Sequence, residues 1–130
     1  MSARIPDDTA LDDADAELRE RANRLPPEAR RAFHDHVART NRDPDTYSAL
    51  NWSLPVGLHH IYMGDWAHLL GTWAAMALGL AALAGGRPGL GALIVALVVA
   101  AELREVFFAK RICRARNLAR ARAKLTELAG

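Results

Sequence analysis

Three histidines and an aspartate gather within ten residues of the chain, at His59, His60, Asp65 and His68. Imidazole and carboxylate groups bind zinc, and zinc sites in proteins usually present them with cysteine or as a histidine pair at a fixed spacing. The sequence contains neither an HExxH nor a CxxC spacing. We therefore predict a polar cluster at a helix boundary, and we expect neither a metal nor another cofactor.

A second polar group, Glu102, Arg104 and Glu105, directly follows an apolar run. Ionisable residues inside a membrane can mark a proton or ion route. At the end of an apolar run, however, long side chains reach water, where they act as anchors or form ion pairs. An anchoring role is favoured, and the alternative is a small transporter or channel component, an oligomer with a pore around Thr72 and Glu102.

The motifs of common enzyme classes are missing from the sequence. It holds no P-loop, no GxSxG and no dinucleotide fingerprint. Ser48 and Ser53 lie near histidines, but no third residue orients them as a triad. His34 and His36 lie two apart on a predicted helix and face different directions, as solvated surface residues do. We predict no catalytic residue and no enzymatic activity, and the sequence identifies no small-molecule substrate.

Charge divides the chain into three regions. Residues 1–46 carry eight arginines against eleven acids, residues 66–101 carry Arg87 as their only charge, and residues 102–130 carry eight basic residues against three acids. We predict an all-α protein with a cytosolic charged helical region at 1–46, a membrane domain at 47–108 and a basic amphipathic helix at 109–130. The charged helices, at 12–24 and 27–40, are too polar to form a core alone, so we expect them on a membrane surface or against a partner.

The membrane domain is predicted to be a helical hairpin. Residues 66–84 are apolar over nearly the roughly 20 residues that a span needs, and residues 85–89 have the composition of a turn. Residues 90–108 form the second span. Because no Gly or Pro occurs at positions 92–129, one long helix is expected to run to the C-terminus.

Residues 47–63 form a mixed segment that is shorter and contains Pro55. An interfacial helix and a third span are both compatible with it. Trp52, Tyr62 and Trp66 have ring types that favour the headgroup level.

The orientation follows from a cluster of basic residues that we assign to a membrane surface. Its members are Lys110, Arg111, Arg114, Arg116, Arg120, Arg122 and Lys124. We predict a multi-pass inner-membrane protein with a cytoplasmic C-terminus. The N-terminus is also expected in the cytoplasm, since residues 1–25 lack the apolar stretch of a secretory signal. Nucleic acid, which the same charges could bind, is not the expected partner.

Three sequence features concern packing. The apolar stripe Ile112, Leu118, Leu125 and Leu128 can pair with the N-terminal helices, with another copy or with lipid. Gly71, Ala75 and Gly79 lie four residues apart, a spacing that allows close helix packing in lipid and association with a second copy or another membrane protein. The single cysteine, Cys113, cannot form an internal disulfide and is expected to be a structural thiol in a reducing compartment.

The segment Gly57-Leu58-His59-His60-Ile61-Tyr62-Met63-Gly64 resembles the signature of the TM-two domain family, small proteins with a pair of transmembrane helices. Gly57, His59, Tyr62 and Gly64 match in register, and Glu102 and Asn117 correspond to a later acid and asparagine. His60 replaces a basic residue and Ile61 an aromatic one, and the chain between Gly64 and Glu102 is longer than in the family. Either this is a divergent bacterial member with an extra span, or the match is local.

The resemblance implies a membrane protein without a known catalytic activity. Together with the residues themselves, it favours a structural, anchoring or protein-interaction role in the lipid bilayer.

Overall fold

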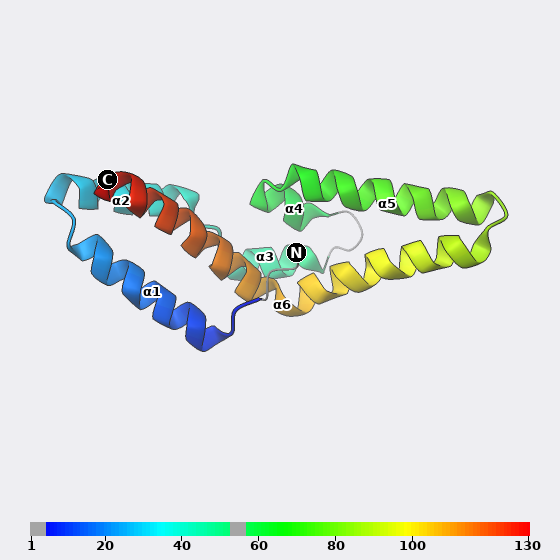
Figure 1. The fold of residues 1–130 in the computed structure, drawn as a ribbon, viewed down its shortest axis with the longest axis horizontal. Coiled ribbons are helices and arrows are strands. Elements are labelled where there is room, and N and C mark those ends of the chain that lie inside the picture. The colour runs from blue at the N-terminus through cyan, green and yellow to red at the C-terminus, as the bar shows by residue number, and fades with distance from the viewer. Residues whose placement is uncertain (1–4, 53–56) are drawn as a thin grey trace. The chain divides into compact units, whose positions relative to one another are not determined.

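A computed structural model describes residues 5–52 and 57–130, and over these residues the chain forms helices and no strands (Figure 1). The predicted all-α fold class is confirmed. In chain order the helices are α1 (Asp8–Asn23), α2 (Pro27–Thr40), α3 (Pro44–Asn51), α4 (Leu58–Met63), α5 (Trp66–Ala84) and α6 (Pro88–Ala129).

The helices belong to two compact units. We call residues 47–109 the hairpin unit, and residues 1–46 with 110–130 the charged unit. Helix α6 contributes its first part to the hairpin unit and its last part to the charged unit. It is the uninterrupted helix predicted from the absence of Gly and Pro.

Helix α1 begins four residues before the predicted position 12. The side chain of Asp7 caps its N-terminus by accepting a hydrogen bond of 2.8 Å from the backbone N–H of Ala10. Ion pairs between acids and arginines four residues apart, such as Asp15 with Arg19, add support along its surface. Helix α2 has the predicted bounds and starts at Pro27, whose fixed φ suits the first helical turn.

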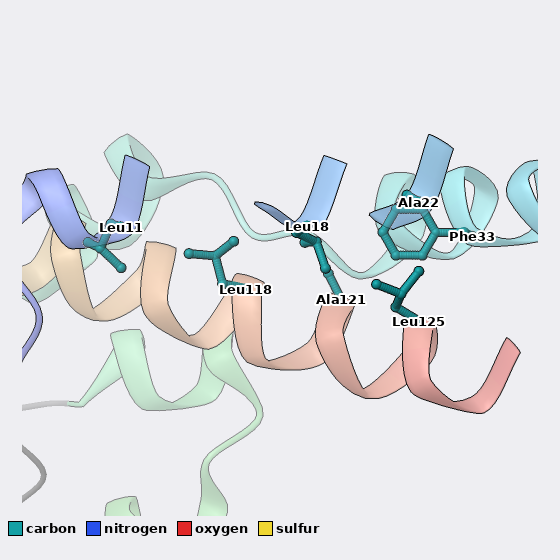
Figure 2. Packing of buried hydrophobic residues seen from close by; sticks show 7 residues of the cluster. All are labelled: Leu11, Leu18, Ala22, Phe33, Leu118, Ala121 and Leu125. Atoms are coloured by element: carbon teal, nitrogen blue, oxygen red, sulfur yellow. The ribbon is translucent and has the colours of Figure 1, made fainter. Parts of the chain in front are cut away.

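A shared apolar core holds the charged unit together (Figure 2). Helix α1 contributes one face to it, α2 contributes Phe33, and the last part of α6 contributes residues three and four positions apart. The buried members are Leu11, Leu18, Ala22, Phe33, Leu118, Ala121 and Leu125. The sequence leaves three partners possible for the apolar stripe with Leu118 and Leu125. In the structure this stripe packs against the N-terminal helices α1 and α2.

The apolar faces of the N-terminal helices therefore pack against the last part of α6, and the expected position of these helices on a membrane surface or against a partner stays a prediction. Two polar helices cannot bury enough apolar area by themselves, but a third helix from the distant C-terminus completes the layer. Loss of an apolar side chain from this core leaves a cavity that the surrounding helices fill only in part.

Acids of the N-terminal region pair with several members of the basic cluster. Lys110 lies 2.6 Å from Asp45, and Arg111 lies 2.7 Å from Asp8. Arg114 also pairs with Asp8, at 3.6 Å. These pairs are largely exposed, and exposed pairs contribute only about 0–1 kcal/mol each. The assignment of the cluster to a membrane surface stays a prediction, and the structure adds an intramolecular partner for part of its charge.

In the hairpin unit, α5 has the predicted bounds and runs beside the first part of α6 (Figure 1). The chain reverses at Gly86, whose φ of +79° lies in the left-handed region that favours glycine. Helix α6 then begins at Pro88, two residues before the predicted position 90, because proline is compatible with the first helical turn.

The two helices approach each other closely at Gly79 and Gly91. A Cβ atom on Gly91 would lie 2.7 Å from the carbonyl oxygen of Gly79 and 2.7 Å from the backbone nitrogen of Leu83. A Cβ on Gly79 would lie 2.9 Å from the Val95 side chain. Gly79 therefore serves packing within the chain, as small residues do where helix backbones meet.

A Cβ on Gly71 would meet nothing within 4 Å. The predicted packing face of Gly71, Ala75 and Gly79 is thus divided: Gly79 contacts α6, while Gly71 faces open space.

The mixed segment at 47–63 contains the end of α3 and the whole of α4, of which α3 has eight residues and α4 six. At 1.5 Å per residue these helices measure about 12 and 9 Å, far less than a bilayer's apolar core of about 30 Å. Residues 53–56, with Ser53 and Pro55, lie outside the described residues.

Candidate functional site

Glycines at both ends give α4 its place in the hairpin unit. Gly57 precedes the helix with φ +71°, and Gly64 ends it with φ +74°. Both conformations are left-handed and cost a residue with a Cβ atom about 1–2 kcal/mol. The two glycines of the family motif therefore allow a helix of only six residues, with the two histidines in its first turn.

The side chains of His59 and His60 meet Glu102 of α6. The His59 Nε2 atom lies 3.4 Å from the Glu102 Oε2 atom, and the His60 Nε2 atom lies 3.5 Å from Oε1. His59 and His60 are 1% and 0% exposed, and Glu102 is 7% exposed. Among the described residues, one ligand-type atom from each lies within 4.8 Å of the other two, an arrangement that can hold a metal ion.

Further polar and aromatic groups surround this cluster. The Glu105 Oε2 atom lies 3.6 Å from His59 Nε2, and the Tyr47 hydroxyl donates a long hydrogen bond of 3.5 Å to the same oxygen. The Tyr47 ring packs edge-on against His59 at a centroid distance of 5.9 Å. His68 stacks on His60 at 4.4 Å and lies 3.6 Å from Glu105.

Helix α5 contributes a hydroxyl to the cluster. Thr72 donates a hydrogen bond of 3.2 Å from its Oγ1 atom to the Glu102 Oε1 atom. Glu102, Thr72 and Ala75 also line a groove between α5 and α6, together with His68, Gly71, Val98 and Ala101. The carboxylate is therefore oriented by α5 and lies in a groove whose other polar lining residues are His68 and Thr72.

The structure brings together part of each predicted set of polar residues. From the first cluster, His59, His60 and His68 meet, but Asp65 caps α5 by accepting a hydrogen bond from the His68 backbone at 3.3 Å. From the family motif, His59 and Glu102 meet.

Asn117, which the resemblance to the TM-two domain family singles out, belongs to the charged unit, where its side-chain amide binds the backbone of Arg42. It donates to the Arg42 carbonyl oxygen at 2.7 Å and accepts from the Arg42 N–H at 3.1 Å. These two hydrogen bonds fix the chain between α2 and α3.

In the residue after Arg42, Asp43, hydrogen bonds from Thr46 hold the pKa of the carboxyl below its usual value.

Cys113 belongs to the same contact. Its side chain is fully buried and donates a hydrogen bond of 3.4 Å to the Arg42 carbonyl oxygen. Burial raises the pKa of the Cys113 thiol, which disfavours the reactive thiolate. The prediction of a structural thiol agrees with this environment.

We expect Cys113 to react with a maleimide at least about 100-fold more slowly than an exposed thiol, because local opening that costs about 3 kcal/mol must precede the reaction. The control is Thr126→Cys in a Cys113→Ala chain, since Thr126 is exposed on the same helix. Labelling would be followed by mass spectrometry with and without denaturant. Equal rates in the two folded chains would contradict the burial of Cys113.

Sequence reasoning missed the contact between the histidines and α6. It placed Glu102 at a membrane edge and the histidines at a helix boundary, without joining them. Charge is the sequence feature that indicates this contact. Two histidines in one apolar segment and two glutamates at the end of another require partners when both segments are buried.

The chain matches no protein-family model, no curated protein and no solved structure.

Proposed function

We propose that the hairpin unit is embedded in the inner membrane and anchors the charged unit at its cytoplasmic face, with a structural or protein-interaction role and no catalysis. One observation carries the proposal. Among the described residues, every large hydrophobic side chain that is exposed belongs to the hairpin unit, whereas His59, His60 and Glu102 of that unit are buried. Apolar groups outside and ionisable groups inside are the arrangement that lipid favours.

Helix α5 supports the proposal by its length and exposure. Its 19 residues extend about 29 Å, close to the apolar thickness of a bilayer, about 30 Å. It is the only helix of the described residues that is long and apolar enough to cross a membrane by itself. Only 11% of that stretch is buried within the structure, unlike the core helix of a water-soluble protein. Soluble proteins rarely expose apolar surface on this scale.

The second span that we propose, in α6, contains charges at Glu102, Arg104 and Glu105. The structure turns Glu102 inward to the histidines and half-buries Glu105. Arg104 is exposed, and its long side chain can reach the headgroups from the cytoplasmic end of the span. The charges that interrupt the apolar run in sequence are therefore compatible with a helix in lipid.

An anchoring role agrees better with this unit than transport by a single copy. Polar residues reach only as far as Thr72 on α5 and Glu102 on α6. Between these positions the only charged residue is Arg87, in the turn. One hairpin thus offers no polar path across the bilayer. The resemblance to the TM-two domain family also favours a non-catalytic membrane protein.

The predicted topology places the turn outside the cell and both parts of the charged unit in the cytoplasm. Asp45, Arg87 and Thr126 are exposed. Each would be replaced in turn with cysteine in a Cys113→Ala chain, so that each variant carries a single cysteine. With a membrane-impermeant maleimide, we expect Arg87→Cys to react in intact cells and the other two only in inverted vesicles. Fractionation of the same cells should retain the protein in carbonate-washed membranes.

A purified chain that stays dissolved and monomeric in buffer without detergent would refute the membrane placement. Labelling of Asp45→Cys in intact cells would instead refute only the orientation.

A further inference from the structure

The buried histidine pair has nitrogen atoms without hydrogen-bond partners among the described residues. They are the His59 Nε2 atom and both ring nitrogens of His60. The acidic oxygens beside the two Nε2 atoms, at 3.4–3.6 Å, are too distant or poorly aligned to count as hydrogen-bond acceptors. A buried polar group that lacks a partner is costly, and native proteins rarely leave one unexplained.

The spacing of these atoms matches that of ligands around one metal ion. Zinc binds imidazole nitrogen and carboxylate oxygen at about 2.0–2.2 Å in a tetrahedral arrangement, which separates neighbouring ligand atoms by about 3.3 Å. The His59 Nε2 atom is 3.4 Å from Glu102 Oε2 and the His60 Nε2 atom is 3.5 Å from Oε1, close to this value, and one ligand atom from each of the three residues lies within 4.8 Å of the other two. An ion between these atoms would partner the His59 and His60 nitrogens that face Glu102.

We propose that His59, His60 and Glu102 bind a divalent first-row transition-metal ion, with zinc as the reference ion. Two imidazoles and one carboxylate are a ligand set that suits zinc and cobalt and leaves a coordination position open. The sequence disfavours such a site because it contains neither HExxH nor CxxC, and the third ligand is 42 residues after His60 along the chain. Binding depends on these three side chains and not on the proposed membrane placement.

The surrounding groups suit this ion in charge and orientation. Thr72 holds Glu102 by its hydrogen bond, and such outer partners orient metal ligands. Glu105, 3.6 Å from His59 Nε2, supplies a second carboxylate. Two neutral imidazoles and two carboxylates balance a divalent ion, so the buried site is neutral overall, which lowers the cost of placing charge away from water. Glu102 also lines the groove between α5 and α6.

The rival explanation is a network of ion pairs in which both histidines are protonated, because it also balances the two carboxylates. Metal titration separates the two. The full-length protein, purified in detergent and stripped with a chelator, would be titrated with Co²⁺ and followed by the ligand-field absorption of the bound ion. We expect one Co²⁺ per chain, in the absorption class of a four-coordinate site, and displacement by Zn²⁺.

Variants test the ligand assignment. Glu102→Gln and His59→Ala should each lower the Co²⁺ affinity at least about 100-fold, since loss of a ligand exceeds the about 10–100-fold cost of losing an outer partner. Thr72→Ala should lower it about 10-fold. The control is the double variant His34→Ala with His36→Ala, which removes two histidines of the charged unit and should leave the affinity unchanged.

Far-ultraviolet circular dichroism would confirm that each variant keeps its helix content. Should Glu102→Gln misfold, the milder Thr72→Ala decides the assignment. Absence of saturable Co²⁺ binding to the folded wild-type chain would overturn the proposal in favour of the ion-pair network. Undiminished binding by folded Glu102→Gln and Thr72→Ala would overturn it as well.

Discussion

Replacing Gly91 with alanine should lower the free energy of unfolding of the hairpin unit by about 1–3 kcal/mol, the usual cost of overpacking. The atoms that block a Cβ here include the backbone of Gly79 and Leu83, at 2.7 Å, and the Leu83 side chain, at 2.6 Å. Backbone cannot rotate away, so α5 and α6 must move apart. This separation should weaken the contacts along the interface between α5 and α6.

Replacing Gly71 with alanine should instead raise the free energy of unfolding of the hairpin unit. Gly71 lies inside α5 with nothing within 4 Å of its Cβ position. Alanine is preferred over glycine inside a helix by about 1 kcal/mol, so Gly71→Ala should stabilise the unit by up to that amount. Unfolding in mixed detergent micelles, followed by the fluorescence of the hairpin tryptophans, would measure both variants. Equal effects at the two positions would show that the close approach at Gly91 is absent.

Replacing Leu125 with alanine should destabilise the charged unit by about 2–5 kcal/mol, as expected for a leucine removed from a packed core. Leu125 is 1% exposed and packs in the cluster that α1, α2 and α6 share (Figure 2). Loss of its side chain leaves a cavity among all three helices. Since each of them needs the others to bury its apolar face, the effect should extend to α1 and α2.

Leu128→Ala provides a matched control, because Leu128 is only partly buried at the edge of the same core. Hydrogen exchange of the α1 amides is the suitable measurement, since a single unfolding transition need not report on one unit of two. We expect markedly faster exchange in Leu125→Ala and a smaller change in Leu128→Ala. The same exchange rates in both variants would mean that the C-terminal part of α6 does not complete this core.

The sequence predicted most helices because their signals are local. Pro27 at a first turn, the glycines at 85 and 86 and the apolar run at 66–84 act on residues within a few positions of themselves. The start of α1 was misplaced by four residues because the cap at Asp7 was not recognised. Spacing alone groups Asp65 with the histidines as a possible ligand, although an aspartate just before a helix is well suited to cap it.

The contacts that define the candidate site were beyond such local signals. His59 and Glu102 are 43 positions apart, and nothing near either residue specifies the other. The same is true of two other contacts. No local signal specifies that Gly79 meets Gly91 or that Leu118 packs against α1 and α2. Several partners were compatible with each pattern, and only the folded chain selects among them.

The sequence by itself determined that this chain is helical, that its apolar residues form a central block, and that its charges lie at both ends. Hydrogen bonding within a helix and the period of its apolar face depend on neighbouring residues, so these properties are written in short segments. The tertiary structure alone decided that the two histidines face the glutamates of α6 and that the acidic and basic ends pack together. Such contacts join distant segments, and their formation depends on the packing of whole helices.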